Sequence, residues 1–443
     1  MKQVNLLTDS PRRLFFHYLG PTIGSSMVTS IYILADTIMV GQGVGDAGLT
    51  IFMPIVASFF ALGLLLGVGG GVLMSVAKGS GNESLAHKYF STAMISAAVV
   101  SVCFAVFGAI FFDPMMYALG ADTTNIELVR GYGLCYTVSA PLFIFSSSLQ
   151  SFIRNDKSPR HAMIAVLTGS GLNILLDYLF IFVFKMGMFG ASFATSIGTS
   201  ITVCILVIHF FTKKNTMRFS FRFFSIKALW EIAKCGFSSF LIECANAVLV
   251  FVFNHTLLKY IGSVGVTVYS IMSNVAVVCM SLFNGVTLAA QPIIATNHGA
   301  DNHKRVLQVR HIGTITSSVI AVIIFCVGFF FPDLLIYSYV NSPTPEILEL
   351  ARYALRIYFF AYLFMNFNIF FSGYFQSTLR PVAAITIQIL RSLLLSSVLV
   401  SVLPMIFGAD AIWYAVPITE CITFFVAMAF LFFGRFKKTK DAK

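Results

Sequence analysis

The run Met163-Ile-Ala-Val-Leu-Thr-Gly-Ser-Gly-Leu-Asn-Ile-Leu-Leu-Asp-Tyr-Leu-Phe-Ile-Phe-Val-Phe184 decides the fold. A run of about 20 apolar residues is long enough for a helix to cross the hydrocarbon core of a bilayer. This run carries one ionisable side chain, Asp177, with Asn173 four residues before it. An acid at that depth is costly unless it has partners and a purpose, and residues four apart share one face of a helix. The run therefore predicts a membrane helix that presents an acid and an amide together.

Composition extends this prediction to the whole chain. The sequence is 58% hydrophobic and 11% charged, with a mean hydropathy of +0.87, which indicates an all-α integral membrane protein. The apolar runs are continuous, whereas strands of a membrane β-barrel alternate apolar and polar residues. We expect twelve transmembrane helices, at residues 14–40, 51–77, 89–112, 127–151, 162–184, 188–211, 231–258, 265–295, 307–331, 348–376, 382–406 and 411–434.

The positions of the basic residues predict the orientation. With the N-terminus placed in the cytoplasm, 23 of the 29 lysines and arginines fall in cytoplasmic segments. This pattern predicts a multi-pass protein of the cell (inner) membrane with both termini cytoplasmic. It also accounts for the net charge of +11 without a nucleic-acid partner. The first 13 residues are polar and basic and lead directly into a full span, so we expect no cleaved signal peptide. The eight cysteines are scattered singly, which favours buried thiols over disulfides.

The chain divides into two halves. We expect an N-lobe over residues 1–211 (helices 1–6), a basic cytoplasmic linker over 212–230 and a C-lobe over 231–443 (helices 7–12 and a basic tail). A weak internal repeat supports this division, since short elements recur 220 residues apart: Val44-Gly45, Gly79 and Asn82 match Val264-Gly265, Gly299 and Asn302. Gln150-Ser151 and Gln376-Ser377 hold similar places before a basic inner segment, at an offset of 226. Both halves begin and end inside, which predicts a parallel repeat.

Four stretches carry a resemblance to a known family: Ala35-Asp-Thr-Ile-Met-Val-Gly41, Phe152-Ile-Arg-Asn-Asp-Lys-Ser-Pro159 with its continuation to Asp177, Gly190-Ala-Ser-Phe-Ala-Thr195 and Gln291-Pro-Ile-Ile-Ala-Thr-Asn-His-Gly299. In this order they resemble the multidrug and toxic compound extrusion (MATE) family, and within it the bacterial branch with the DinF-like and MepA-like exporters. The resemblance covers almost the full length. Lys157 and Tyr178 depart from the residues common in the family, and neither is a proposed ligand.

The resemblance implies two six-helix lobes in a V around a central cavity. It further implies export of cationic or amphipathic organic compounds in exchange for protons or sodium. The ion site of DinF-like members lies in the N-lobe, and its positions are matched here by Asp36, Asn173, Asp177 and Thr195, with the Ala191 carbonyl as a further ligand.

The chemistry of these groups fits either ion. Asp36 and Asp177 on one cavity would share a proton, because two like charges at close range disfavour double ionisation. Their oxygens, with those of Asn173 and Thr195, also form the hard-oxygen shell that would serve as a metal site for sodium. Proton and sodium coupling both remain open, as does the alternative that each aspartate only anchors a helix.

Other polar groups within the spans have two interpretations each. Pro21, fifteen residues before Asp36, either lets the first helix bend as a conformational hinge or fixes a kink. Glu243 either contacts cationic substrates, or serves as a second ion site, or pairs with Arg391, for which Glu420 is an equal partner. We expect Gln150, Tyr32 and Asn274 to line the substrate cavity, with helix–helix hydrogen bonding as the alternative.

These features favour a secondary active antiporter working by alternating access as a monomer. We expect organic cations or amphipathic drugs as substrates and no cofactor besides the coupling ion, H⁺ or Na⁺. A flippase for lipid-linked saccharides would need a cationic cavity, for which only Arg391 is a candidate. A membrane enzyme acting on lipids would need catalytic motifs that the sequence lacks, and an ATP-driven pump would need a Walker motif. A channel is a third alternative, which the twofold repeat disfavours.

Overall fold

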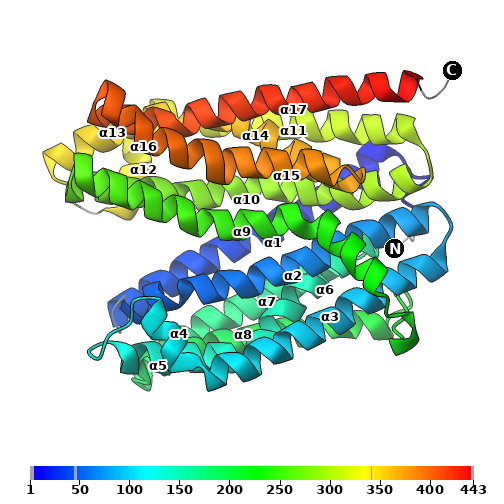
Figure 1. Ribbon diagram of the computed structural model, residues 1–443, viewed down its shortest axis with the longest axis horizontal. Helices are drawn as coiled ribbons and strands as arrows, with labels where there is room; N and C mark the ends of the chain where they lie inside the picture. The colour runs from blue at the N-terminus through cyan, green and yellow to red at the C-terminus, as the bar shows by residue number, and fades with distance from the viewer. Residues whose placement is uncertain (1–3, 44–46, 341, 441–443) are drawn as a thin grey trace.

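The structure is a computed structural model that describes residues 4–43, 47–340 and 342–440. Val44-Gly45 of the predicted repeat lies outside the described residues, as do Lys2 and Lys443, two of the basic residues counted as cytoplasmic. Every regular element in the described ranges is a helix, as predicted. Figure 1 shows the helices running roughly along the long axis of the molecule, with both chain ends at the same end of the bundle.

The described residues of the first half form ten helical elements. They are α1 (Pro11–Gly43), α2 (Ala47–Gly79), α3 (Glu83–Ile110), α4 (Phe112–Ala118), α5 (Ile126–Val138), α6 (Ala140–Asn155), α7 (Pro159–Asp177), the π-helical turn η1 (Tyr178–Val183), α8 (Gly187–Ile208) and the 3₁₀ turn η2 (His209–Phe211).

The second half begins after the 3₁₀ turn η3 (Phe221–Phe223). It holds α9 (Ile226–Tyr260), α10 (Ser263–Gly299), α11 (His303–Phe330), α12 (Pro332–Tyr339), α13 (Pro345–Phe359), α14 (Tyr362–Ser377), α15 (Pro381–Ile389), the π-helical turn η4 (Leu390–Leu394), α16 (Leu395–Phe407), the 3₁₀ turn η5 (Ala409–Tyr414) and α17 (Ala415–Lys440). Because α9 begins at Ile226, residues 226–230 of the predicted linker are helical.

Ten helical segments within the described residues are long and apolar enough to span a bilayer. Two further spans are bent pairs: α5 with α6 at 51°, and α13 with α14 at 46°. Counting each pair once gives the twelve spans that the sequence predicts. The bends at residues 139 and 360–361 fall inside predicted spans 127–151 and 348–376, where hydropathy alone gives no sign of them.

Short loops place the helix starts of both halves in the same way. Asn82 caps the start of α3, accepting a hydrogen bond from the Leu85 N–H, and Asn302 caps α11 in the same way. The residues just before these caps, Gly81 and Asp301, both have left-handed backbone, with φ of 77° and 55°. The structure thus gives the predicted repeat at offset 220 a common local geometry.

The repeat offset of 226 is wrong. Lys157 and Leu379 are the left-handed residues before α7 and α15, with φ of 60° and 55°, and each is followed by a proline at the helix start. Their spacing sets the offset at 222 in this region. The counterparts of Asn173 and Asp177 are therefore Leu395 and Leu399, so the acidic site is not repeated in the second half.

The two halves meet along α2 and α10, and the two backbones come into direct contact at Gly79 and Gly299. A Cβ built on Gly79 would lie 2.0 Å from the Thr296 carbonyl oxygen, and one on Gly299 would lie 2.0 Å from that of Val76. Thr296 and Val76 are themselves 220 residues apart, so these two contacts are the same contact seen from either half. Only glycine allows such an approach of two backbones.

Helix α1 packs against both halves. Its first turns bury Leu14, Phe15 and Tyr18 in a hydrophobic cluster with residues of α10, α11, α14, α15 and α17. The Thr22 hydroxyl also donates to the Gly285 carbonyl of α10, at 2.7 Å. Further along, α1 packs on α7, the helix that carries Asp177. Helix α1 thus connects the interior of the second half to the candidate site in the first.

Candidate functional site

Asp36 on α1 and Asp177 at the end of α7 face each other in the interior of the first half. Their side chains are 6% and 0% exposed, and their carboxyl groups approach within hydrogen-bonding reach. Two carboxyl groups form a hydrogen bond only when one of them carries a proton. The structure thus brings together the two acids that the sequence analysis places on one cavity, and a proton shared between them would join the two carboxyl groups.

Asn173 lies one turn before Asp177 and is connected to α8. Its Nδ2 donates to Thr195 Oγ1 at 3.2 Å, and the Thr195 hydroxyl donates to the Ala191 carbonyl at 3.0 Å. All three residues are buried. The Ala191 carbonyl, predicted as an ion ligand, is thus already accepting the Thr195 hydroxyl.

Several oxygens of this cluster have no hydrogen-bond donor among the described residues. They are Asp36 Oδ1, Asn173 Oδ1 and both carboxyl oxygens of Asp177. Buried polar atoms are nearly always satisfied, so four orphaned acceptors together indicate a position for a proton, a cation or water. Within the described ranges, no group of three His, Cys, Asp or Glu residues could hold a metal ion, so a bound cation would depend on the amide and hydroxyl oxygens as well.

Two tyrosines of α5 belong to the cluster and were missed by the sequence analysis. Tyr132 and Tyr136 stand one turn apart with ring centroids 5.2 Å from each other, and both interact electrostatically with Asp36. The Tyr132 hydroxyl is buried and interacts with the Tyr136 hydroxyl as well as with Asp36, so hydroxyl donors are available near the orphaned acceptors. Their spacing of four on a buried helix was the available signal, but aromatic pairs of this kind are common in membrane helices.

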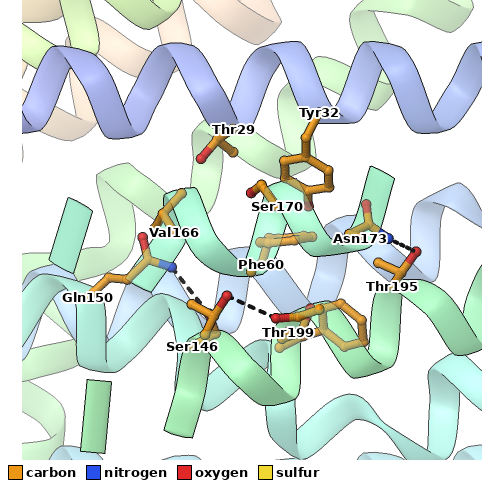
Figure 2. Close-up of a pocket in the computed structure, with 14 residues that line it drawn as sticks. Thr29, Tyr32, Phe60, Ser146, Gln150, Val166, Ser170, Asn173, Thr195 and Thr199 are labelled. Carbon is orange, nitrogen blue, oxygen red and sulfur yellow. Dashed lines mark hydrogen bonds between the residues drawn. The ribbon is translucent and has the colours of Figure 1, made fainter. Parts of the chain in front are cut away.

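A cavity opens beside this cluster (Figure 2). Predicted ion ligands Asn173 and Thr195 line it together with the predicted substrate contacts Tyr32 and Gln150. Gln150 donates to the Ser146 hydroxyl at 3.2 Å. The cavity volume of about 60 Å³ suits a few water molecules and is far below the volume of a drug-sized site. Tyr32 and Gln150 therefore share a small chamber with the predicted ion ligands Asn173 and Thr195.

Glu243 and Asn274 lie elsewhere. Glu243 is half-buried on α9 and has no ion pair or hydrogen bond to any residue the structure describes. Asn274 is half-buried on α10 and does not line the chamber. Neither is brought together with the acids of α1 and α7. Pro21 is buried within α1, which continues as one helix to Asp36 and beyond.

Arg391 pairs with Glu420, which resolves the choice left by the sequence in favour of Glu420 over Glu243. Arg391 donates to Glu420 Oε1 from Nε at 3.1 Å and from Nη2 at 2.8 Å. Asn368 donates from its Nδ2 to the other carboxylate oxygen at 2.7 Å. These three side chains are at most 5% exposed. A buried charge is tolerated when it is paired and hydrogen-bonded in this way.

The Arg391–Glu420 pair occupies the position in the second half that corresponds to the chamber in the first half. At offset 222, Asn368 and Arg391 correspond to Ser146 and Gly169. The left-handed Gly187 and Gly408 set an offset of 221 for the next helix, so Glu420 corresponds to Thr199. Ser146, Gly169 and Thr199 all line the chamber, and Ser146 and Thr199 point toward each other in Figure 2. An ion pair therefore fills one half where the other has a water-sized space.

Comparison with known proteins agrees with this architecture. The sequence pattern of the MatE family matches residues 21–179 and 235–402, more than half of the chain. This chain belongs to the MatE family. Each matched segment lies within one half of the internal repeat, and the first contains Asp36 and Asp177.

Related proteins and solved structures align with this MatE transporter over almost the full length of the chain. Multidrug export protein MepA of Staphylococcus haemolyticus is 25% identical over 434 residues, covering 97% of this chain and 95% of the relative. A MATE structure in complex with MaL6 aligns with a TM-score of 0.91 at 21% identity, covering 99% of both chains. The outward-facing conformation of a multidrug resistance MATE family transporter of the MOP superfamily also aligns at 0.91 and 21% identity, covering 99% and 98%. The MatE chain is a transporter of the membrane and not an enzyme.

Proposed function

We propose that this MatE transporter exports cationic or amphipathic organic compounds and drives the export by taking up protons or sodium. The observation that carries the proposal is the set of orphaned acceptor oxygens on Asp36, Asn173 and Asp177. A buried group of acceptors with two carboxyl groups in contact has room for one positive charge. The MepA relatives, which are multidrug export proteins, support the direction and the cargo.

The coupling ion would act through α1. When Asp36 and Asp177 share a proton or bind sodium, their repulsion is removed and α1 can draw closer to α7. Because the first turns of α1 are packed into the second half, such a movement changes the contact between the halves. Loss of the ion to the cytoplasm reverses it, and substrate then binds from inside.

The experiment is transport in proteoliposomes under an imposed pH or sodium gradient. Asp36→Asn and Asp177→Asn should abolish gradient-driven export while the protein remains folded. Asp410→Asn removes an exposed carboxylate of the second half and should transport like the wild type. Full gradient-driven activity in both buried variants would falsify the coupling site, and the gradient that drives the wild type identifies the ion.

Pro21 is proposed as the hinge of α1. A proline inside a helix leaves the carbonyl four residues earlier without its donor, so bending there breaks no hydrogen bond. Pro21→Ala should lower transport while export still depends on the same ion gradient. Unchanged transport in this variant would remove the hinge from the mechanism.

We propose that the protein works in the cell membrane as a monomer with both termini in the cytoplasm. Both chain ends lie at one end of the bundle, and the basic residues are concentrated in the segments that this topology places inside. The acids, the amide and the chamber all come from one chain. A tag at either terminus should be protected from protease that is added to intact cells. Digestion of either tag in intact cells would contradict this topology.

A flippase for anionic lipid-linked saccharides receives no support from the site. Arg391, the candidate cation for a pyrophosphate, already has its charge compensated by Glu420 at 2.8 Å. The orphaned groups of the first half are acceptors and would repel an anionic cargo.

A further inference from the structure

The connection between the two halves exposes an unusual number of large apolar side chains. From the end of η2 to the second turn of α9, six of them face away from the protein, with exposed fractions between 45% and 86%: Phe211, Phe219, Phe221, Phe224, Ile226 and Trp230. We call these six residues the linker patch. Phe219, Phe221 and Phe224 lie outside the predicted spans and outside the helices that are long and apolar enough to cross a bilayer, so contact with the acyl chains of the hydrocarbon core does not account for the whole patch.

The backbone under the patch is held firmly. Thr216 donates its N–H to the buried Asp156 carboxylate at 3.0 Å, and Lys78 and His209 donate to the same carboxylate at 2.6 and 2.8 Å. Further on, the Ser220 N–H donates to Ser91 on α3, at 3.1 Å. The linker therefore lies fixed against the first half at the end of the bundle that holds both termini (Figure 1). Its aromatic side chains are presented by an ordered segment and not by a loose loop.

The length of α9 sets the depth of the patch. Its 35 residues rise about 52 Å at 1.5 Å per residue, against about 30 Å for the hydrocarbon core. At least one end of α9 therefore extends beyond the hydrocarbon core, and its residues 226–230 precede the predicted span 231–258. Trp230 is one of these residues, and Lys234 Nζ lies 5.1 Å from the centre of its indole ring. Tryptophan with a neighbouring lysine is the usual composition at this level of a membrane.

The charges around the patch have one sign. Six exposed basic residues are interleaved with it, and none has an ion pair among the described residues: Lys213, Lys214, Arg218, Arg222, Lys227 and Lys234. The acid in this stretch, Glu231, accepts a hydrogen bond from the Tyr89 hydroxyl of α3 at 2.5 Å. Aromatic and basic side chains alternating at the depth of the headgroups complement an anionic lipid surface.

We propose that the linker patch docks on anionic phospholipid headgroups of the leaflet next to the chain termini. The phenylalanines enter the boundary of the acyl chains, Trp230 lies at the headgroup level, and Arg218, Arg222 and Lys227 contact phosphates. Since the linker is bonded to α3 and to Asp156, the lipid holds the first half in place relative to the membrane plane while the second half moves.

Trp230 provides the measurement. The chain has two tryptophans, Trp230, which is 63% exposed, and Trp413, which is 1% exposed and gives a constant background. The full-length protein is reconstituted in neutral vesicles with a small fraction of phospholipid brominated near the top of the acyl chain. This quencher is carried on phosphatidylglycerol in one series and on phosphatidylcholine in the other. We expect Trp230 to recruit the anionic quencher at least about fivefold better, since one basic residue at the surface already contributes that factor.

Three variants make the result specific. Trp230→Phe should remove the quenching. Arg218→Gln/Arg222→Gln/Lys227→Gln should abolish the preference for the anionic quencher. The matched variant Arg12→Gln/Arg13→Gln/Lys304→Gln removes three exposed charges elsewhere on the same end and should keep the preference.

Three outcomes would overturn the proposal. They are equal quenching by both lipids, no quenching by either, which would indicate that the patch is covered by protein, and the same loss of preference in the matched variant as in the linker variant. If the linker variant does not fold, salt titration of the wild type replaces it. In that case the preference should fall as salt screens the charges, and a preference unchanged by salt would also overturn the proposal.

Discussion

Arg391 Nη2 lies 2.8 Å from Glu420 Oε1, at the place in the second half that corresponds to Gly169 and Thr199 in the first. The same helical scaffold is thus filled by a buried ion pair on one side and left hollow on the other. The buried charges of each half also adjoin a π-helical turn, since η1 follows Asp177 directly and η4 contains Arg391. Turns of this kind are found often at functional positions of helices.

The first prediction concerns this ion pair. Arg391→Met or Glu420→Leu alone should lower the free energy of unfolding by about 3–5 kcal/mol, because each leaves the other charge buried without a partner. The double variant should recover most of that loss, since no charge remains. Chemical denaturation of the four proteins in detergent measures the coupling. A double variant as unstable as the two losses added together would show that the two side chains do not depend on each other.

A second prediction concerns Thr195. Thr195→Val removes the acceptor of Asn173 and the donor to Ala191, while Thr195→Ser retains both. We expect Thr195→Val to lose about 1 kcal/mol for each hydrogen bond in the affinity for the coupling ion, measured as a shift of the ion dependence of transport. Thr195→Ser should follow the wild type. A serine variant as defective as the valine variant would mean that the methyl group, and not the hydroxyl, is what the site requires.

Glycines at the contact of the two halves give a third prediction. Gly79→Ala places a methyl group 2.0 Å from a backbone oxygen that cannot rotate away, so the halves must separate locally. Overpacking of this kind costs about 1–3 kcal/mol or more, and transport should fall with it. Gly20→Ala in α1 meets nothing within 4 Å and should be neutral or stabilising by up to about 1 kcal/mol. Thermal unfolding compares the two, and equal stability would contradict the direct backbone contact.

Asp156 makes stability depend on pH. Burial alone would raise the pKa of this carboxyl, but the hydrogen bond with His209 and the charge and hydrogen bond of Lys78 lower it from 3.8 to about 2. A lowered pKa stabilises the fold fully above about pH 4, and that contribution is lost as the pH falls to about 2. It amounts to about 2 kcal/mol.

Asp156→Asn should be less stable than the wild type at pH 6 and should lose less stability between pH 4 and pH 2. Thermal unfolding across this range measures the difference. Asp410→Asn, which changes an exposed carboxylate, should follow the wild type over the same range. Parallel curves for wild type and Asp156→Asn would contradict the lowered pKa.

The sequence sufficed for the number of membrane-spanning helices, since length and apolarity report on the membrane alone. It could not show the bends at residues 139 and 360–361, because an average of hydropathy along a span carries no information on the direction of the helix axis. The offset of 226 failed for a related reason. That offset rests on matching the dipeptide Gln-Ser in the two halves. The true alignment is set by the backbone of the left-handed residues Lys157 and Leu379, whose side chains have nothing in common.

Within the site, the ionisable residues were predictable and their surroundings were not. An acid inside an apolar run stands out, and Asp36 and Asp177 are found together. Tyr132 is indistinguishable in sequence from the many aromatic residues that face lipid, so its place beside Asp36 emerges only in three dimensions. The sequence also left the partner of Arg391 open, because Glu243 and Glu420 both lie in apolar stretches. Only the packing of α14, α15 and α17 shows that Glu420 is the partner.

At Gly79 and Gly299, α2 and α10 cross closely and without a side chain from either glycine. Helices normally interlock through side chains, and sliding one past the other forces those chains out of their grooves. Here carbonyl oxygens lie directly against the Cα atoms of Gly79 and Gly299, so no side chain of these two residues interlocks with the other helix. Turning one half against the other at this crossing therefore displaces no side chain of Gly79 or Gly299.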